Sequence, residues 1–359
     1  MIHLTINHGV DLMQSVDKID LKICLLNAEN LFLLFESEPP SHYQSLNESQ
    51  WQRLSTSIYE NKPLFKTQKI AQALKEINSD IILLCEVGGR ESLENFNKYF
   101  LNSEYSVALI EGNSDRNIDV GFLVRKNLPF YFDLHTNKNR LINYLYPHER
   151  DSLRTGYPLV KVTGVSHKFS RDCAELHLFA KDPLNPFLII LLTHLKSRLD
   201  PDRVDPGGFE RRQAELKTLV EIYNETKVKF PQARILLAGD FNGNAARANT
   251  DEEFKPLYSE TDLEDCLEIA KLPEAERATF YQVRSAGRSD GRQIDFCFLD
   301  QTLSSHLDLK QCHVYRWSDN FGSPLPAPRN LEQKLLMPSD HYPVVLKLLN
   351  LTVLPQKKS

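Results

Sequence analysis

Six short apolar segments, each bordered by a polar side chain suited to catalysis or metal binding, constrain the fold of this chain most strongly. The segments are rich in Ile, Leu, Val and Phe and do not alternate with polar residues. Such runs are typical of strands buried on both faces of a sheet, and therefore indicate a layered α/β protein. They are Leu21–Leu26, Ile81–Cys85, Phe187–Thr193, Arg234–Ala238, Ile294–Leu299 and Tyr342–Leu349.

Amphipathic helices are predicted directly before two of these strands. Apolar residues recur at helical spacing before the strands at 81 and 234, namely Ile70, Ala73, Leu74 and Ile77 and then Leu216, Leu219, Val220 and Tyr223. The two halves of the chain therefore share an order of helix, strand and acidic residue, without a sequence repeat.

The remaining polar segments show no clear periodicity and are expected to be loops. They cover about 36–60, 137–155, 198–208 and 318–338. The last contains Pro324, Pro326, Pro328 and Pro338, so we expect a loop there, and it is a candidate for gating the substrate. No segment resembles an interdomain linker. We therefore expect one catalytic domain over 21–350, with an N-terminal extension at 1–20 and a C-terminal tail at 351–359.

Composition narrows the classes of partner. The formal net charge of −5 predicts neither a basic nucleic-acid-binding face nor a membrane-adsorbing surface. Phosphate groups must then be contacted locally, through a few Lys and Arg side chains or through a bound cation. The six cysteines form no close pairs, which argues against a zinc or disulfide framework. With no signal-peptide pattern and no apolar run of about 18 residues, a cytoplasmic protein is expected.

The polar residues at the strand ends suggest a metal site. Each alone has an ordinary explanation as a turn former, a cap or a structural histidine. Glu86 and Asp295 are harder to explain in this way, because a buried carboxylate is costly without a cation or donors. Oxygen-rich sets of this kind suit Mg²⁺ or Mn²⁺. The full set is Asn27, Glu29, Glu86, His194, Asp240, Asn242, Asp295, Asp340 and His341.

Hydrolysis of a phosphate ester needs groups of these types. Charge on the pentacoordinate transition state has to be neutralised, and a water molecule has to be deprotonated or aligned. We expect Asp240 to accept that proton, with Asn242 holding Asp240 and a phosphate oxygen. A histidine paired with a carboxylate, His341 with Asp295, is expected to act as a protonated phosphate clamp.

At these residues the sequence resembles the endonuclease/exonuclease/phosphatase superfamily, which has the DNase I-like fold. The resemblance extends from about residue 21 to 350. It rests on LNAENLF at 26–32, DIILLCEV at 80–87, RNIDVGFLV at 116–124, SRDCAELHLF at 170–179, THLKSR at 193–198, AGDFN at 238–242, QIDF at 293–296 and SDHYPV at 339–344. It implies a four-layer α-β-β-α sandwich, in which two packed mixed β-sheets are flanked by helices.

The resemblance also implies roles for the residues. Metal binding falls to Asn27, Glu86 and Asp340, with Glu29 nearby, and phosphate stabilisation falls to His194. Asp240, Asn242, Asp295 and His341 complete the catalytic set. The expected activity is a metal-dependent phosphodiesterase, most readily a nuclease. A phosphatase or a lipid phosphodiesterase acting on sphingomyelin or inositol phosphates is the alternative, because the fold does not fix the substrate. An inactive binding module would have lost catalytic residues, and all are present.

Two departures from the family bear on the substrate. Gly291-Arg292-Gln293 stands where inositol-polyphosphate 5-phosphatases carry a Pro-Ala-Trp-like run, and Leu26-Asn27 replaces the Trp-Asn opening of abasic-site endonucleases. For a nucleic-acid substrate, the expected phosphate-binding cations are Arg171, Lys196 and Arg198. Arg211 and Arg212 fit either that role or a solvated helix face.

Overall fold

The structure is a computed structural model that describes residues 18–55, 57–150, 166–180, 182–284 and 287–353. Most of the predicted extension and tail therefore lies outside the described residues, as does 151–155 of the loop predicted at about 137–155. Among the described residues, no helix is long and apolar enough to cross a membrane.

Two mixed six-stranded sheets form the centre of the molecule. The strand order of the first sheet is β13-β14-β1-β2-β4-β3. Its strands are β1 (Lys18–Leu31), β2 (Ile81–Val87), β3 (Tyr105–Ala108), β4 (Asp119–Arg125), β13 (His313–Val314) and β14 (Val344–Thr352). β1 and β2 run parallel, whereas the other neighbours are antiparallel.

The second sheet repeats this plan. Its order is β5-β6-β7-β8-β12-β9, with β7 and β8 as the parallel pair. Its strands are β5 (Tyr131–Thr136), β6 (Cys173–Phe179), β7 (Leu188–His194), β8 (Arg234–Asp240), β9 (Glu264–Asp265) and β12 (Asp295–Leu299). A separate hairpin consists of β10 (Phe280–Val283) and β11 (Ser289–Arg292).

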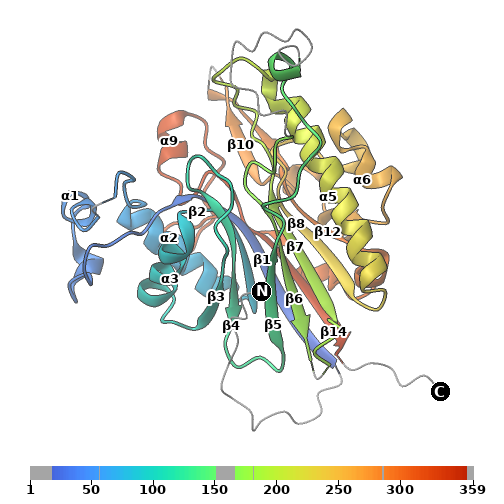
Figure 1. Ribbon diagram of the computed structural model, residues 1–359. Helices are drawn as coiled ribbons and strands as arrows, with labels where there is room; N and C mark the ends of the chain where they lie inside the picture. Colours follow the sequence, from blue (N-terminus) through green and yellow to red (C-terminus); the bar gives the residue numbers. More distant parts are fainter. Residues whose placement is uncertain (1–17, 56, 151–165, 181, 285–286, 354–359) are drawn as a thin grey trace.

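Helices cover the outer faces of both sheets and complete four layers (Figure 1). α2 (Leu64–Ile77) and α3 (Gly89–Phe100) lie outside the first sheet, and α5 (Phe209–Lys229) and α6 (Pro256–Ser259) lie outside the second. The shorter helices are α1 (Glu48–Gln52), α7 (Cys266–Ile269), α8 (Gln301–Ser304) and α9 (Leu331–Leu335). The predicted α-β-β-α sandwich is therefore confirmed.

The apolar pattern of the sequence explains this packing. The four periodic residues predicted for each of the two helices are all buried. In β7, Ile190 and Leu192 belong to the core between the sheets, whereas Ile189 and Leu191 pack toward α5. Because successive side chains of a strand point to opposite faces, a strand apolar throughout is buried on both.

Segments predicted to be loops contain short helices. α9 lies within 318–338, where its N-cap Asn330 accepts a hydrogen bond from the Gln333 N–H, 2.8 Å away. α1 lies within 36–60 and has a capping box between Asn47 and Gln50. One-turn helices hold too few residues to show apolar periodicity, and their capping residues are also common in turns.

Candidate active site

The register of the second sheet places three predicted residues in one row. His194, the last residue of β7, is paired with Asp240, the last residue of β8, and Asp240 is paired with Asp295, the first residue of β12. Residues paired in this way project to the same face of a sheet. The three side chains thus meet at one end of the sandwich.

Gly239 allows β7 and β8 to approach closely just before Asp240. A Cβ atom at position 239 would lie 1.9 Å from the main-chain oxygen of Thr193, so no side chain fits there. The glycine of the AGDFN segment is therefore needed for the pairing that places Asp240 beside His194.

Asp240 is buried and is held from both sheets. The Asn27 amide, from β1, donates a hydrogen bond to Asp240 Oδ2 at 2.9 Å, and the Asn242 N–H donates to Oδ1 at 2.8 Å. His194 Nε2 lies 3.5 Å from Oδ2. Burial, together with the nearby charge of Asp295, raises the pKa of Asp240 to about 7. A carboxylate with that pKa suits a general base near neutral pH.

Asn242 differs in part from the prediction. Its main-chain N–H holds Asp240, but its side-chain amide donates to the main-chain oxygen of Leu195 at 3.1 Å. Asn242 has φ +52°, a left-handed conformation that asparagine tolerates better than most residues. The side chain that holds Asp240 is instead that of Asn27, which was predicted as a metal ligand.

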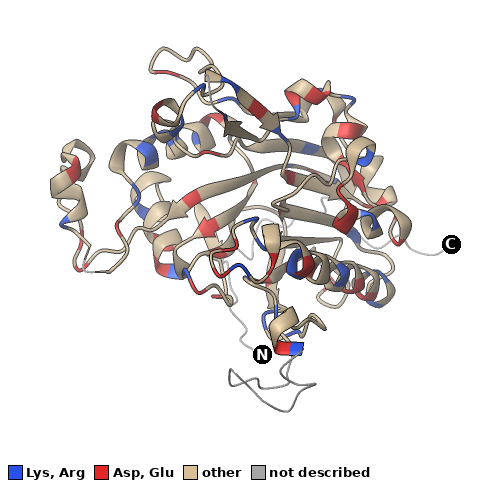
Figure 2. Ribbon diagram, turned by 90° about the horizontal axis from the view of Figure 1, so that it is seen from above, with Lys and Arg blue, Asp and Glu red and all other residues tan. Residues whose placement is uncertain are grey.

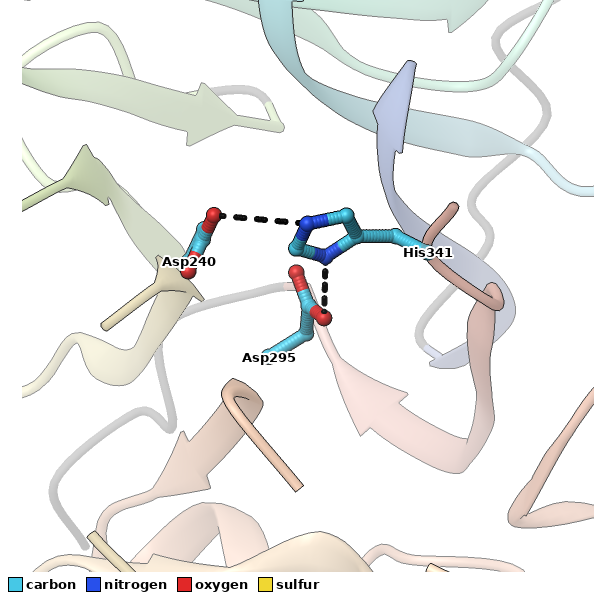
Figure 3. A group of neighbouring side chains, drawn as sticks. All are labelled: Asp240, Asp295 and His341. Atoms are coloured by element: carbon cyan, nitrogen blue, oxygen red, sulfur yellow. Dashed lines mark hydrogen bonds and ion pairs between the residues drawn. The ribbon is translucent and has the colours of Figure 1, made fainter. Parts of the chain in front are cut away.

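His341 forms the predicted pair with Asp295. Its Nδ1 lies 2.8 Å from Asp295 Oδ2, and its Nε2 lies 3.9 Å from Asp240 Oδ2 (Figure 3). Burial alone would lower the pKa of His341, but the charge and hydrogen bond of Asp295, with Asp340 and Asp240 nearby, raise it well above the ordinary value. His341 is therefore an imidazolium facing the base, as the clamp requires.

His194 has the opposite character. Burial, followed by the charges of Arg171, His341 and Arg116, lowers its pKa well below the ordinary value. Its Nδ1 has no hydrogen-bond partner among the described residues. The site therefore combines a neutral histidine with a protonated one, and a neutral histidine can present one donor to a phosphate oxygen.

Glu86 lies at the same end of the first sheet. Its Oε2 accepts the Asn30 N–H at 3.1 Å, and its Oε1 lies 3.9 Å from His194 Nε2. Glu86 has φ +60°, an uncommon conformation for this residue type that is often found at functional sites.

Asp340 directly follows Ser339 in the chain. The hydroxyl group of Ser339 donates a hydrogen bond to the main-chain oxygen of Asn27 at 2.8 Å. This hydrogen bond connects the segment Ser339-Asp340-His341 to β1.

Glu29 is engaged by two lysines. Lys62 Nζ and Lys66 Nζ lie 3.3 Å and 3.0 Å from Glu29 Oε2. Both lysine side chains are almost fully buried, and burial lowers the pKa of Lys62 to about 8. Glu29, which was predicted near the metal, therefore balances buried positive charge.

Two sets of residues are candidates for binding a divalent cation. Asp240, Asp295 and His341 each offer one ligand atom, and these atoms lie within 4.8 Å of one another. However, an imidazolium has no free lone pair, and Asp295 already accepts its hydrogen bond. The oxygen donors of Asn27, Glu86 and Asp340 suit Mg²⁺ or Mn²⁺ better, because these ions prefer carboxylate and carbonyl ligands.

Only one of the three predicted phosphate-binding cations is buried in the site. The Arg171 side chain is buried, and its Nε lacks a hydrogen-bond partner among the described residues. Burial lowers the pKa of Arg171, although the charges of Glu215, Glu86 and Asp240 oppose this shift. Lys196 Nζ donates to the main-chain oxygen of Leu199 at 2.6 Å. Arg198 pairs with Asp251 at 2.7 Å and is half exposed.

Arg211 and Arg212 do not form a solvated helix face. Arg212 pairs with Glu253 at 2.6 Å, with both side chains only 3% exposed. Arg211 donates to the Tyr146 hydroxyl at 3.0 Å and lies 3.6 Å from Glu215. That alternative was wrong because helical periodicity reports apolar residues only, whereas these cations are buried with polar partners.

Three contributors to the site were not singled out from the sequence. The Thr279 hydroxyl oxygen accepts the N–H groups of Ile294 and Asp295, each at 3.1 Å, and fixes the start of β12. Arg116 donates to the Asn30 side chain at 2.7 Å. Lys334, on α9, lies 3.3 Å from Asp340 Oδ2. Thr279 and Lys334 carry no motif, and Lys334 lies in a segment interpreted as a loop, whereas Arg116 opens a segment interpreted only as a strand.

Two packed mixed sheets with helices on their outer faces define the DNase I-like fold, as the motifs predicted. Family models and curated protein sequences give no match to this chain. Truncated TDP2 from Caenorhabditis elegans is similar in structure, with a TM-score of 0.53 and 15% identity over 92% of this chain and 97% of that one.

Two further solved structures share the fold. TDP2 from D. rerio, complexed with a single-strand DNA product, has a TM-score of 0.53 and 14% identity, covering 91% of this chain and 98% of that one. The human Nocturnin catalytic domain with a bound sulfate anion has a TM-score of 0.50 and 15% identity, covering 93% of this chain and 96% of that one. At these identities the likeness concerns the fold.

Proposed function

We propose that this chain is a divalent-metal-dependent phosphodiesterase that hydrolyses nucleic acid. One observation carries the proposal: a buried carboxylate with a raised pKa, Asp240, faces the His341–Asp295 pair at the shared end of the two sheets. A proton acceptor opposite a cationic donor is the arrangement that in-line hydrolysis of a phosphate ester requires.

The chain's own residues account for the activation of the water and for the stabilisation of charge. A water molecule aligned by Asp240 attacks phosphorus, its proton passes to the Asp240 carboxylate, and the bond from phosphorus to the leaving oxygen breaks. His341 stabilises the negative charge that accumulates on the phosphoryl oxygens, and Asp295 keeps its imidazole oriented and protonated. His194 and Arg171 offer further donors. The leaving oxygen takes up a proton from solvent to become a hydroxyl group, and the proton taken up by Asp240 returns to solvent when the product leaves.

We propose Asn27, Glu86 and Asp340 as the residues that hold the cation. When bound, a divalent cation supplies Lewis-acid neutralisation of phosphoryl charge. Titration calorimetry with Mn²⁺ separates this set from the Asp240–Asp295–His341 set. Glu86→Gln should weaken Mn²⁺ binding at least tenfold, because a neutral amide replaces a charged ligand. Asp295→Asn should leave Mn²⁺ affinity within about threefold. The reverse ranking would place the cation at Asp295.

Nucleic acid is proposed as the substrate for two reasons. The structurally similar TDP2 from D. rerio is complexed with single-strand DNA. In addition, Arg171 and Arg116 lie on the His194 side of the site, where they could contact phosphates of a chain. Figure 2 shows Lys and Arg interspersed with Asp and Glu over the molecule, which agrees with local cations rather than one basic face.

A substrate panel tests the proposed function. Purified protein is incubated with single- and double-stranded DNA, RNA, inositol phosphates and sphingomyelin, with Mg²⁺ or Mn²⁺ and with EDTA. We expect cleavage of DNA or RNA that EDTA abolishes and added metal restores. Release of phosphate or a headgroup from the small or lipid substrates, without nucleic-acid cleavage, would instead establish the phosphatase or lipid phosphodiesterase alternative.

A further inference from the structure

One carboxylate outside the reacting groups bonds to two segments of the site. Glu215, on α5, is fully buried, and its two oxygens accept two main-chain N–H groups. Oε1 accepts the N–H of Ser170 and Oε2 accepts the N–H of Lys196, each at 2.7 Å. The Ser170 amide directly precedes Arg171, and the Lys196 amide lies two residues after His194. One side chain thus ties together the segments that carry both residues.

α5 also holds the other side of the Lys196 residue. Arg212 donates from NH1 to the main-chain oxygen of Lys196 at 3.1 Å, and Arg212 is itself fixed by Glu253. The preceding residue, Leu195, is held from β8: its N–H donates to the main-chain oxygen of Asp240 at 3.0 Å. The backbone that leaves His194 is therefore bonded at successive peptide groups to α5 and to the strand of Asp240.

From these contacts we infer that Glu215 is a positioning residue for the active site. It acts through Arg171 and His194, which are the residues proposed to contact the substrate, and Glu215 itself does not contact the substrate. This inference rests on the proposed phosphodiesterase function. Its physical basis is that side chains aligned for reaction lose efficiency when they shift by about 1 Å, with losses on the order of 100-fold.

A carboxylate is needed here because two N–H donors converge on one side chain. A glutamine at 215 would offer one acceptor oxygen and would turn its NH₂ group toward the second N–H. One buried main-chain donor would then lose its partner, which is unfavourable. The charge partner of Arg211, 3.6 Å away, would also be lost. Glu215→Gln is therefore almost isosteric yet breaks the connection.

The same helix provides a matched control. Glu221 also pairs with an arginine, Arg140, at 3.3 Å, but its side chain is 40% exposed. Glu221→Gln makes the same chemical change on α5 without touching the site. Both variants and the wild type are compared by main-chain amide hydrogen exchange, by binding of inorganic phosphate, and by kcat and KM on the substrate found by the panel.

The expected results separate positioning from a general loss of stability. Glu215→Gln should speed amide exchange at Ser170 and Lys196 at least tenfold, weaken phosphate binding, and lower kcat about 10- to 100-fold. KM should change much less than kcat, and exchange in the strand cores should stay slow. Glu221→Gln should match the wild type throughout.

Exchange of the two amides does not depend on turnover, so this inference and the proposed function can fail separately. Unchanged exchange at Ser170 and Lys196 in Glu215→Gln, with normal cleavage, would overturn the inference alone. If no substrate is cleaved, the proposed function fails while the exchange result still decides whether the connection exists. If Glu215→Gln does not fold, exchange in the wild type decides: the two amides should be protected like those of β7, and exchange at the rate of exposed loops would refute the inference.

Discussion

At Asp240, an amide, a main-chain N–H and an imidazole surround a single carboxylate. The partners come from β1, from the turn after β8 and from β7, and Asp295 adds a second negative charge. Burial and the charge of Asp295 raise the pKa of Asp240 to about 7, although the hydrogen bonds from Asn242 and Asn27 lower it, and this value suits a group that accepts a proton near neutral pH. The same site keeps His194 neutral and His341 charged, so two histidines differ only through what surrounds them.

The His341–Asp295 pair should behave as one unit in catalysis. His341→Ala and Asp295→Ala should each lower kcat/KM by about 10²- to 10⁴-fold, because either change removes the oriented imidazolium. The double variant should lose little more than the worse single variant, since residues that act together are strongly non-additive. Steady-state kinetics of the four proteins measures this. Losses that multiply would show that the two residues contribute independently.

At the scale of elements, the pairing of β7 with β8 carries the site. Both strands, and the helix α5 between them in the chain, were predicted from apolar runs and helical periodicity, which are local signals. The hydrogen bonds to Glu215 and Thr279 were not predicted, because they connect residues distant in sequence through single polar atoms. The sequence gives one indication of the role of Glu215, because this charged residue lies directly beside the apolar stripe that contains Leu216 and Leu219.

Gly239→Ala should separate β7 from β8. The new Cβ would overlap the Thr193 oxygen, so one strand must move. We expect the free energy of unfolding to fall by at least about 2–3 kcal/mol, the scale of overpacking in a core. Gly322→Ala is the control, because its Cβ would meet no atom within 4 Å although φ is +82°. Its left-handed backbone should cost about 1–2 kcal/mol. Chemical denaturation compares the two, and equal losses would refute the steric account.

For the whole molecule, the site exists only where two sheets meet. Asn27 and Glu86 belong to the first sheet, and His194, Asp240 and Asp295 belong to the second. The polar residues at strand ends predicted which side chains converge, and the family resemblance implied the four layers. The partners of each residue were not predicted. Asn27 holds Asp240, and Glu29 balances two lysines. The predicted cations Lys196 and Arg198 bond to Leu199 and Asp251. Such choices depend on packing between segments far apart in sequence.

Stability should depend on pH through Asp265, which is fully buried in β9. Burial raises its pKa to about 7, although Gln293 donates a hydrogen bond to it. Between about pH 4 and 7 the folded protein binds a proton that the unfolded chain has released, so the free energy of unfolding falls as pH rises. Asp265→Asn removes this ionisation. As pH rises through this range, its free energy of unfolding should therefore increase relative to that of the wild type by at most about 1.4 kcal/mol per pH unit. Denaturation at several pH values measures the difference, and parallel curves would contradict it.

The most direct test of the account is the turnover of Asp240→Asn on the substrate that the wild type cleaves with Mn²⁺. An amide can still accept the hydrogen bond from the Asn242 N–H but cannot take a proton from water. We predict that kcat falls by about 10²- to 10⁴-fold while the circular dichroism spectrum and Mn²⁺ affinity stay close to those of the wild type. Wild-type turnover in Asp240→Asn would contradict the central claim that this buried carboxylate is the base.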